Sequence, residues 1–410
     1  MSTTYSIPGA VLTEREHIVP LDHAQPDGQK ITVFTREIAD PDGRDKPYLV
    51  YLQGGPGMEA PRPVTPPSGW VKRALRDFRV LMLDQRGTGR STPVGMEIPG
   101  DTPEAQAEYL THFRADSIVR DAELIRQELG VERWSTLGQS FGGFCTMTYL
   151  SIAPHGLREC FITGGLAPIG RPVDDVYRAT YKLAARKNAD YFARYPGDRV
   201  RAKEIFARLD ADDVRLPNGD RLTARRMRQL GNWLGFTDTW EAIHHLLELP
   251  FGSNGFLYDA ERGAAGFGRN PMYATIHEAS YADGGATRWS ASRLYPHEFD
   301  EQGCFTAEHI YPWMFEDYGA LHSHRAAAEI LAKHEWPRLY DPDVLAHNEV
   351  PVSAAVYFED LFVVSQFSIE TAAAIRGLKP WITNEYEHNG LRADGERLLG
   401  RLIDLCRGRA

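Results

Sequence analysis

Four short apolar runs in this sequence each end in glycine or polar turn residues: YLVYLQGG (48–55), FRVLMLDQRG (78–87), RWSTLGQS (133–140) and ECFITGG (159–165). Segments with helical periodicity, such as ADSIVRDAELIRQELG (115–130), lie between several of them. Strands that are apolar on both faces are typical of parallel sheets that helices cover on both sides. We therefore predict an α/β fold with a mostly parallel central sheet and helices on both of its faces.

This alternation of strands and helices stops near residue 170. The following residues are rich in arginine, histidine, tryptophan and tyrosine, and their pattern predicts mainly helices and loops. The strand pattern returns in VPVSAAVYFED (350–360) and KPWITNEYEH (379–388), before a final helix. We predict a core in two parts, residues 1–168 and 346–410, separated by a mainly helical insertion of residues 169–345, called the helical insertion below.

Composition and charge exclude several classes of function. The formal net charge of −10 and the lack of a long basic run argue against nucleic-acid binding. No stretch approaches about 18 consecutive apolar residues, so we expect no membrane-spanning helix. The four cysteines lack metal-binding spacing, which predicts free thiols, no metal and no cofactor. Since the N-terminus also lacks the pattern of a secretory signal, we predict a cytoplasmic protein.

A serine stands between glycines at the turn from a predicted strand to a predicted helix. The turn is Gly138-Gln139-Ser140-Phe141-Gly142, a G-x-S-x-G pattern. In this context the serine occupies a strained turn that exposes its hydroxyl, and the small flanking residues let the helix approach the neighbouring strand. The helix N-terminus also favours negative charge at this point. We predict that Ser140 is a nucleophile.

A serine hydroxyl becomes a good nucleophile only when a base takes its proton. In this type of fold the chain order is serine, then an acid, then histidine. His388 follows the last predicted strand and is our predicted base, whereas His347 precedes the strand at 350–360 and is in the wrong order. Asp360 is our predicted acid because it lies furthest past the apolar run, and Glu359 is the alternative.

An oxyanion hole needs two N–H donors aimed at the developing negative charge. The backbone N–H of Phe141 is one predicted donor, because it follows the nucleophile. The second is expected from QGGPG, which follows the strand at residues 48–52, with Gly55 as the preferred donor and Gly54 next. Pro56 has no N–H and is excluded.

The segment DQRGTGRS (84–91) follows another predicted strand. Its glycines do not have the spacing of a phosphate-binding loop. We expect Asp84, Arg86 and Arg90 to form an ion-pair network that supports the neighbouring oxyanion loop, which is a structural role.

Taken together, the motifs LQGGPG, DQRGTGRS, GQSFGG, YFEDLF and EYEHNG resemble those of the prolyl iminopeptidases, serine peptidases of the α/β-hydrolase fold. The resemblance spans nearly the whole chain. It implies an α/β-hydrolase core with a helical cap, and the removal of an N-terminal proline from peptides. It also implies Ser140 as nucleophile, Asp360 as acid and His388 as base. Many relatives have histidine at the position of Gln53, but the donor there is a backbone group.

The resemblance also implies that a glutamate of the helical insertion binds the free amine of a peptide substrate. The segment IHEASYADGGATRWSASR resembles the family's cap and points to Glu278, while Glu241, in DTWEAIHH, matches less closely. Several aromatic residues of the insertion are expected either to shape a proline pocket or to form the apolar core of the insertion. They are Trp233, Trp240, Tyr281, Trp289 and Trp313.

The sequence thus predicts a serine aminopeptidase that releases N-terminal proline, or other residues, through an acyl-enzyme. One alternative is an esterase or another hydrolase that acts on non-peptide or longer N-terminal substrates. A catalytically silent binding protein with the same fold is the third hypothesis, and the order of serine, acid and histidine argues against it.

Overall fold

The computed structural model describes residues 2–263 and 267–410, and in these residues nine strands form one sheet in the order β1-β2-β3-β5-β4-β6-β7-β8-β9. The first three strands and β5 pair in antiparallel fashion, and β5, β4 and β6 to β9 are parallel. The bounds are β1 (Ser2–Ile7), β2 (Ala10–Pro20), β3 (Lys30–Ala39), β4 (Tyr48–Leu52), β5 (Arg79–Asp84), β6 (Trp134–Gln139), β7 (Leu157–Thr163), β8 (Val352–Tyr357) and β9 (Leu378–Thr383).

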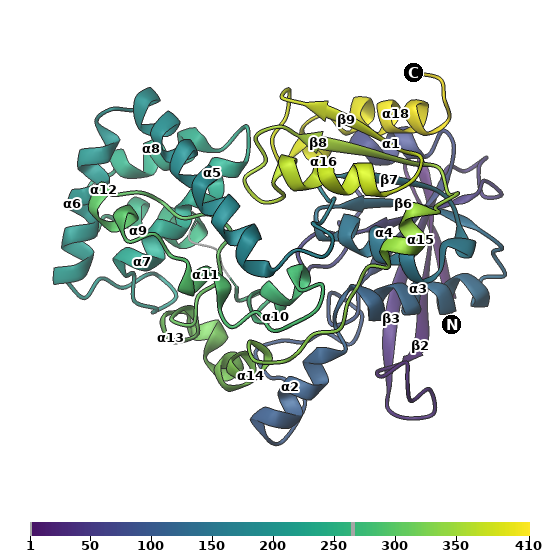
Figure 1. Cartoon of the computed structure of the whole chain (residues 1–410), viewed down its shortest axis with the longest axis horizontal. Helices are drawn as coiled ribbons and strands as arrows, with labels where there is room; N and C mark the ends of the chain where they lie inside the picture. The colour runs from purple at the N-terminus through teal and green to yellow at the C-terminus, as the bar shows by residue number, and fades with distance from the viewer. Residues whose placement is uncertain (1, 264–266) are drawn as a thin grey trace.

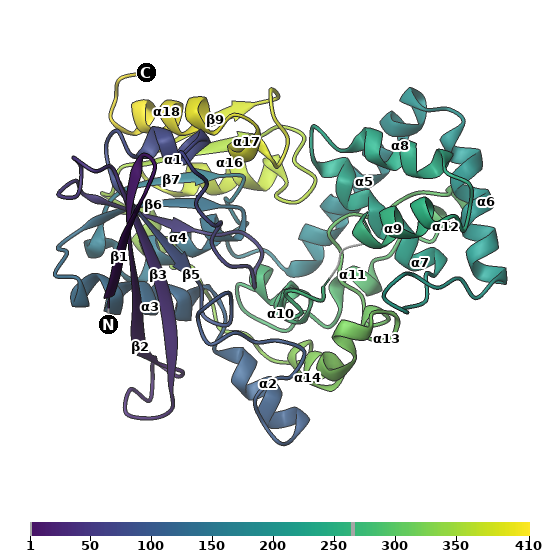
Figure 2. The ribbon, with the colours of Figure 1, turned by 180° about the vertical axis from the view of Figure 1, so that it is seen from behind.

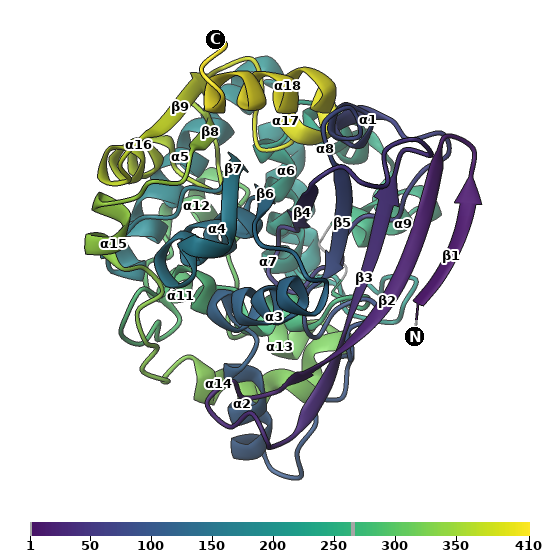
Figure 3. The ribbon, with the colours of Figure 1, turned by 90° about the vertical axis from the view of Figure 1, so that its right-hand side faces the viewer.

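Helices cover both faces of this sheet (Figure 3). Helices α1 and α18 pack together on one face, while α3 and α4 pack together on the other, where α16 also contacts β8 and β9. The core helices are α1 (Gly69–Ala74), α2 (Pro103–Thr111), α3 (Ala115–Glu128), α4 (Phe141–Ile152), the 3₁₀ helix η1 (Pro154–Gly156), α16 (Ser365–Ala374), α17 (Gly390–Ala393) and α18 (Gly395–Cys406).

The strand β4 shows why its sequence is apolar throughout. Leu49 and Tyr51 belong to the apolar cluster under α1 and α18, whereas Val50 and Leu52 belong to the cluster under α3 and α4. Successive side chains of a strand point to opposite faces, so a strand covered on both sides needs apolar residues at every position. The four runs predicted as strands are β4, β5, β6 and β7, and these predictions are confirmed.

The helical insertion forms a second body beside the sheet, and α2 of the core packs against its helix α14 (Figures 1 and 2). Its elements are α5 (Val173–Arg194), α6 (Asp198–Ala211), α7 (Ala224–Met227), η2 (Arg228–Gly235), α8 (Trp240–Glu248), α9 (Asn254–Gly263), α10 (Met272–Ile276), η3 (Glu278–Tyr281), α11 (Ser290–Arg293), α12 (Glu298–Gln302), α13 (Met314–Asp317), η4 (Gly319–His324), α14 (Arg325–Leu331) and α15 (Pro342–Ala346). The helical character predicted there is confirmed, and the domain boundaries at 168/169 and 345/346 stay a prediction.

Within the described ranges, no helix combines the length and the apolar character that crossing a bilayer requires.

The backbone of α4 lies very close to the strands at its N-terminal end. A Cβ atom built on Gly142 would overlap the carbonyl oxygen of Leu52 in β4, and one built on Gly138 would overlap the carbonyl oxygen of Gly142. A Cβ atom on Gly143 would likewise overlap Gly165, which follows β7. The glycines of GQSFGG are therefore required by close backbone packing, as the sequence pattern predicted.

Replacing Gly142 with alanine should force α4 away from β4. Because the obstacle is backbone, we expect the free energy of unfolding to fall by about 2 to 3 kcal/mol. Urea unfolding measures this change, with Gly95→Ala as the matched control, since a Cβ atom at Gly95 meets nothing within 4 Å. Equal stability of the two variants would contradict the packing argument.

Candidate active site

Ser140 connects β6 to α4 in a conformation that non-glycine residues rarely adopt. Its φ is 53° and its ψ is −123°. Its backbone is held on both sides, because Ser140 N–H donates to Thr163 O at 3.0 Å and Ser140 O accepts from Gly143 N–H at 2.7 Å. A backbone outlier of this kind costs on the order of 1–3 kcal/mol, and it persists because the surrounding structure fixes it.

Three side chains that are far apart in the sequence form one hydrogen-bonded chain. Ser140 Oγ lies 2.9 Å from His388 Nε2, and His388 Nδ1 lies 2.8 Å from Asp360 Oδ2. Ser140 follows β6, Asp360 follows β8 and His388 follows β9, so all three come from the carboxyl ends of parallel strands. This is the edge of an open α/β sheet where ligands bind.

The carboxylate of Asp360 is fixed on its other side by backbone donors. Its Oδ1 accepts hydrogen bonds from Phe362 N–H and Val363 N–H, both at 2.9 Å, and the residue is fully buried. Glu359, the alternative acid, points elsewhere and pairs with Arg186 and Lys187. Asp360 is therefore the acid that contacts the imidazole.

The surroundings of His388 determine its protonation. Burial by itself would lower the pKa of His388, but the charge and hydrogen bond of Asp360, together with the charge of Glu308, raise that pKa above its ordinary value. Because Nδ1–H donates to the carboxylate, the neutral ring presents the lone pair of Nε2 to the Ser140 hydroxyl.

The predicted oxyanion loop lies directly beside Ser140. Gly54 and Gly55 line the same cavity as Ser140, and a Cβ atom on Gly54 would stand 3.0 Å from Ser140 Cβ. Phe141 begins α4, and the first N–H groups of a helix have no partner within that helix. The carbonyl of Gln53 is held by Gln85 Nε2–H at 2.9 Å. The roles of Gly54, Gly55 and Phe141 as oxyanion donors stay a prediction.

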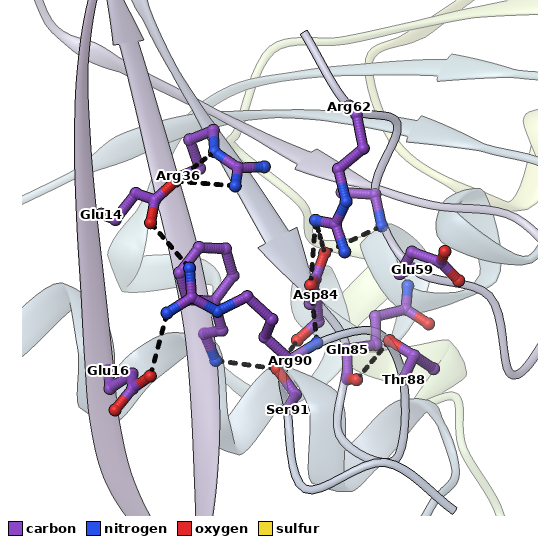
Figure 4. Close-up of polar contacts among 12 residues, drawn as sticks. Glu14, Glu16, Arg36, Glu59, Arg62, Asp84, Gln85, Thr88, Arg90 and Ser91 are labelled. Carbon is purple, nitrogen blue, oxygen red and sulfur yellow. Dashed lines mark hydrogen bonds and ion pairs between the residues drawn. The ribbon is translucent and has the colours of Figure 1, made fainter. Parts of the chain in front are cut away.

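The expectation of one ion-pair network among the charged residues of 84–91 is wrong. Asp84 accepts from Ala60 N–H at 3.2 Å and pairs with Arg62, and thus holds the loop after the oxyanion glycines (Figure 4). Arg90 instead reaches Glu14 and Glu16 on β2. The third member, Arg86, is buried against Asp121 of α3. Among the described contacts, the segment supports the loop through Asp84, whose carboxylate also accepts from Arg90 N–H at 3.0 Å, and through Gln85.

A cavity of about 680 Å³ opens onto Ser140 and His388. Its other walls come from the oxyanion loop and the helical insertion. They include Met58, Pro61, Pro63, Val64, Trp70, Phe236, Tyr273 and Glu308. Among the described residues that line it, the cavity combines a large apolar surface with three charged residues, Glu308 of the insertion and Arg62 and Arg392 of the core.

Glu308 is the functional candidate that sequence reasoning missed. Tyr273 Oη donates a hydrogen bond to it, and His277 Nε2 lies 3.4 Å from its carboxylate. Burial alone would raise the pKa of Glu308, but the contacts with His277 and Tyr273 and the charge of His388 lower it below its ordinary value. The signal available in the sequence was an acid within the largely apolar stretch CFTAEHIYPW.

The structure does not bring the two predicted glutamates to this cavity. Neither Glu278 nor Glu241 is among the described residues that line the cavity. Glu278 is buried, and its carboxylate accepts hydrogen bonds from Ser290 N–H and Ala291 N–H, so it caps the short helix α11. Glu241 pairs with Arg194 at the surface of the helical insertion. Their expected positions at the site are thus corrected.

The five aromatic residues expected either at a proline pocket or in the core are likewise absent from the described cavity wall. Tyr281 is buried and packs edge-on against Phe144 of α4, and the four tryptophans pack against the apolar core. Phe236 and Tyr273 are the insertion's aromatic residues in the wall instead.

One group of described side chains has the spacing of a metal site, namely His244, His245 and Glu248 on α8. None of the three is among the described residues that line the cavity at Ser140. This group therefore supplies no metal ligand next to Ser140.

Comparisons with known proteins show the fold and the family of this chain. A family model of the alpha/beta hydrolase fold matches residues 47–242. The chain is 50% identical over 405 residues to a proline iminopeptidase of Aeromonas sobria, covering 95% of both chains. It is 34% identical over 416 residues to proline iminopeptidase aneH of Aspergillus aculeatus, covering 94% of this chain and 92% of that one.

Among solved structures, the proline iminopeptidase of Mycobacterium smegmatis matches with a TM-score of 0.50 at 15% identity, over 96% of this chain and 98% of that one. That similarity concerns the fold alone, and it confirms the predicted α/β-hydrolase fold. The full-length sequence similarity confirms the resemblance seen in the motifs, and the chain belongs to the proline iminopeptidase family.

Proposed function

We propose that this protein is a serine aminopeptidase that releases N-terminal proline from peptides. The observation that carries the proposal is the hydrogen-bonded chain Ser140–His388–Asp360, which opens into the same cavity as the carboxylate of Glu308. The named activity of its relatives, proline iminopeptidase, agrees with this chemistry.

In the proposed mechanism, His388 Nε2 takes the proton of Ser140 Oγ as the hydroxyl attacks the carbonyl carbon of the first residue. Asp360 holds the imidazole in the required tautomer and stabilises the imidazolium that forms. The N–H groups of Phe141 and of Gly55 or Gly54 bind the oxyanion. His388 then protonates the leaving amine, and water, activated by the same base, hydrolyses the acyl-enzyme.

In this proposal, the carboxylate of Glu308 binds the protonated N-terminal amine of the substrate. A secondary ammonium of an N-terminal proline is a hydrogen-bond donor and a cation, and Glu308 is held ionised by its contacts with Tyr273 and His277. A carboxylate near the nucleophile also restricts cleavage to the first peptide bond. The apolar walls, such as Phe236 and Met58, suit the pyrrolidine ring and the leaving peptide.

A cytoplasmic location also remains part of the proposal. The support is that Cys145, Cys160, Cys304 and Cys406 are all free thiols, and disulfides are rare where the compartment is reducing. The negative net charge supports the absence of a nucleic-acid partner.

Replacing Ser140 with alanine removes the atom that attacks the substrate. We expect kcat/KM for proline β-naphthylamide to fall at least about 10⁴-fold, as for other serine nucleophiles. The matched control is Ser323→Ala, whose exposed hydroxyl donates to Met96 O outside the described cavity wall and should not affect hydrolysis. Full peptidase activity in Ser140→Ala would refute the mechanism.

Replacing Asp360 with asparagine should lower the pKa of His388, because burial would then act without the opposing carboxylate charge. In the wild type the raised pKa means that protonated His388 stabilises the fold fully at acidic pH, and this contribution is lost as the pH rises through the folded-state pKa. Histidine NMR titration of both proteins measures the change. An unchanged or higher His388 pKa in the variant would contradict the assignment.

Replacing Glu308 with glutamine tests recognition of the free amine. We expect KM for proline β-naphthylamide to rise about 10-fold or more, as an ionic hydrogen bond is lost, while hydrolysis of an N-blocked proline ester should not fall. Glu241→Gln and Glu278→Gln are the matched controls from the helical insertion. A larger KM increase in either control than in Glu308→Gln would assign the amine to that glutamate, and efficient use of N-blocked substrates by the wild type would favour an esterase.

A further inference from the structure

A lysine of the helical insertion reaches both loops that carry the predicted acid and base. Lys187 lies on α5 and is only 1% exposed. Its Nζ donates a hydrogen bond to Glu387 and lies 3.3 Å from Glu359. Glu359 directly precedes Asp360, and Glu387 directly precedes His388. One ammonium group therefore joins the loop after β8 to the loop after β9.

Burying Lys187 with its carboxylate partners carries a free-energy penalty that an apolar residue would avoid. Removing an ammonium and a carboxylate from water carries a penalty of several kcal/mol per ion, which only good pairing offsets. An apolar side chain of similar size would fill the space under Trp240, whose ring centre lies 5.5 Å from Lys187 Nζ, without that penalty. Lys187 is not among the described residues of the cavity wall, so we assign it no direct part in substrate binding or proton transfer.

A second set of contacts connects the loop after β9, which carries His388, to the helical insertion. His388 N–H donates to Gly235 O at 3.2 Å, and Glu387 N–H donates to Thr237 Oγ1 at 3.2 Å. One residue further along, Asn389 Nδ2–H donates to Asp238 Oδ1 at 2.8 Å. The segment that holds His388 is thus bound by the insertion through its backbone as well as through Lys187.

We propose that Lys187 is a positioning residue of the active site, which holds the loops of Asp360 and His388 against the helical insertion in the geometry that activates Ser140. The inference rests on the proposed function, because it assigns Lys187 a part in that same reaction. It also makes the insertion a structural support of the reacting groups, in addition to its place as a wall of the cavity.

The proposal has an electrostatic consequence for His388. The carboxylates of Asp360 and Glu308 act directly on His388. Glu387 and Glu359, which precede His388 and Asp360 in the chain, pair with Lys187, and Glu359 also pairs with the exposed Arg186. Lys187 is the buried cation among them. Its removal leaves the negative charges less compensated, which favours the imidazolium, so the acid limb of the pH profile should move to higher pH.

The test compares Lys187→Met with Arg186→Met, its exposed neighbour, which pairs with Glu359 only on the solvent side. For proline β-naphthylamide, we expect Lys187→Met to lower kcat about 10- to 100-fold, the scale of a misplaced reacting group. KM should change less than about threefold because Glu308 is untouched. The acid limb of kcat/KM should move to higher pH, and Lys187→Arg should restore part of kcat. Arg186→Met should change neither quantity.

A second variant separates the charge from the positioning. In Lys187→Met/Glu387→Gln we expect the acid limb to return toward the wild-type pH while kcat stays low. If Lys187→Met does not fold, the single variant Glu387→Gln tests the role of Lys187 instead. We expect this variant to lower kcat and to move the acid limb to lower pH. Wild-type kcat and an unmoved acid limb, in Lys187→Met or in that single variant, would overturn the proposal.

The rate at which a fluorophosphonate labels Ser140 tests the role of Lys187 independently of the proposed peptidase activity. Labelling requires an activated serine but no recognition of proline. A wild type that labels rapidly without cleaving proline β-naphthylamide would refute the proposed function only. Equal labelling rates in the wild type and Lys187→Met would refute the role of Lys187.

Discussion

The close approach of backbones around Ser140 is the constraint on which the rest of the site depends. Gly138 and Gly142 lie where any side chain would overlap a carbonyl oxygen, so α4 can start directly against β4 and β6. This packing forces Ser140 into its positive-φ conformation and points its hydroxyl beyond the sheet edge. The loops after β8 and β9 end at the same edge, and they bring Asp360 and His388 to that hydroxyl.

The sequence predicted those parts of the molecule that local patterns determine. Strands that are apolar on both faces, the glycines of the turn, and the order of Ser140, Asp360 and His388 follow from short segments and from the topology of a parallel sheet. Glu308 could not be found in this way, because its position depends on how helices without a strict period pack on one another. Motif similarity indicated Glu278, but only the fold shows that its carboxylate is used by backbone donors of α11.

Glu278 and Glu308 of the helical insertion have different roles because their surroundings differ: Glu278 is buried, whereas Glu308 is partly exposed in the cavity wall. Burial raises the pKa of Glu278, and its backbone donors offset this only in part. Burial also acts on Glu308, but contacts with His277 and Tyr273 and the charge of His388 outweigh it and lower the pKa. Glu308 is therefore an anion facing the cavity, whereas Glu278 serves the local fold. The insertion contributes this anion, an apolar wall and, through Lys187, support for the loops that carry the acid and the base.

In the proposed mechanism, Ser140 carries the acyl group during turnover. The most direct measurement is rapid acid quenching of the wild-type protein with a proline ester, followed by mass spectrometry of its peptides. We expect a peptide containing Ser140 that is heavier by one prolyl group and that disappears as hydrolysis proceeds. Rapid turnover with an unmodified Ser140 peptide at every time point, or a prolyl group on another residue, would contradict this mechanism.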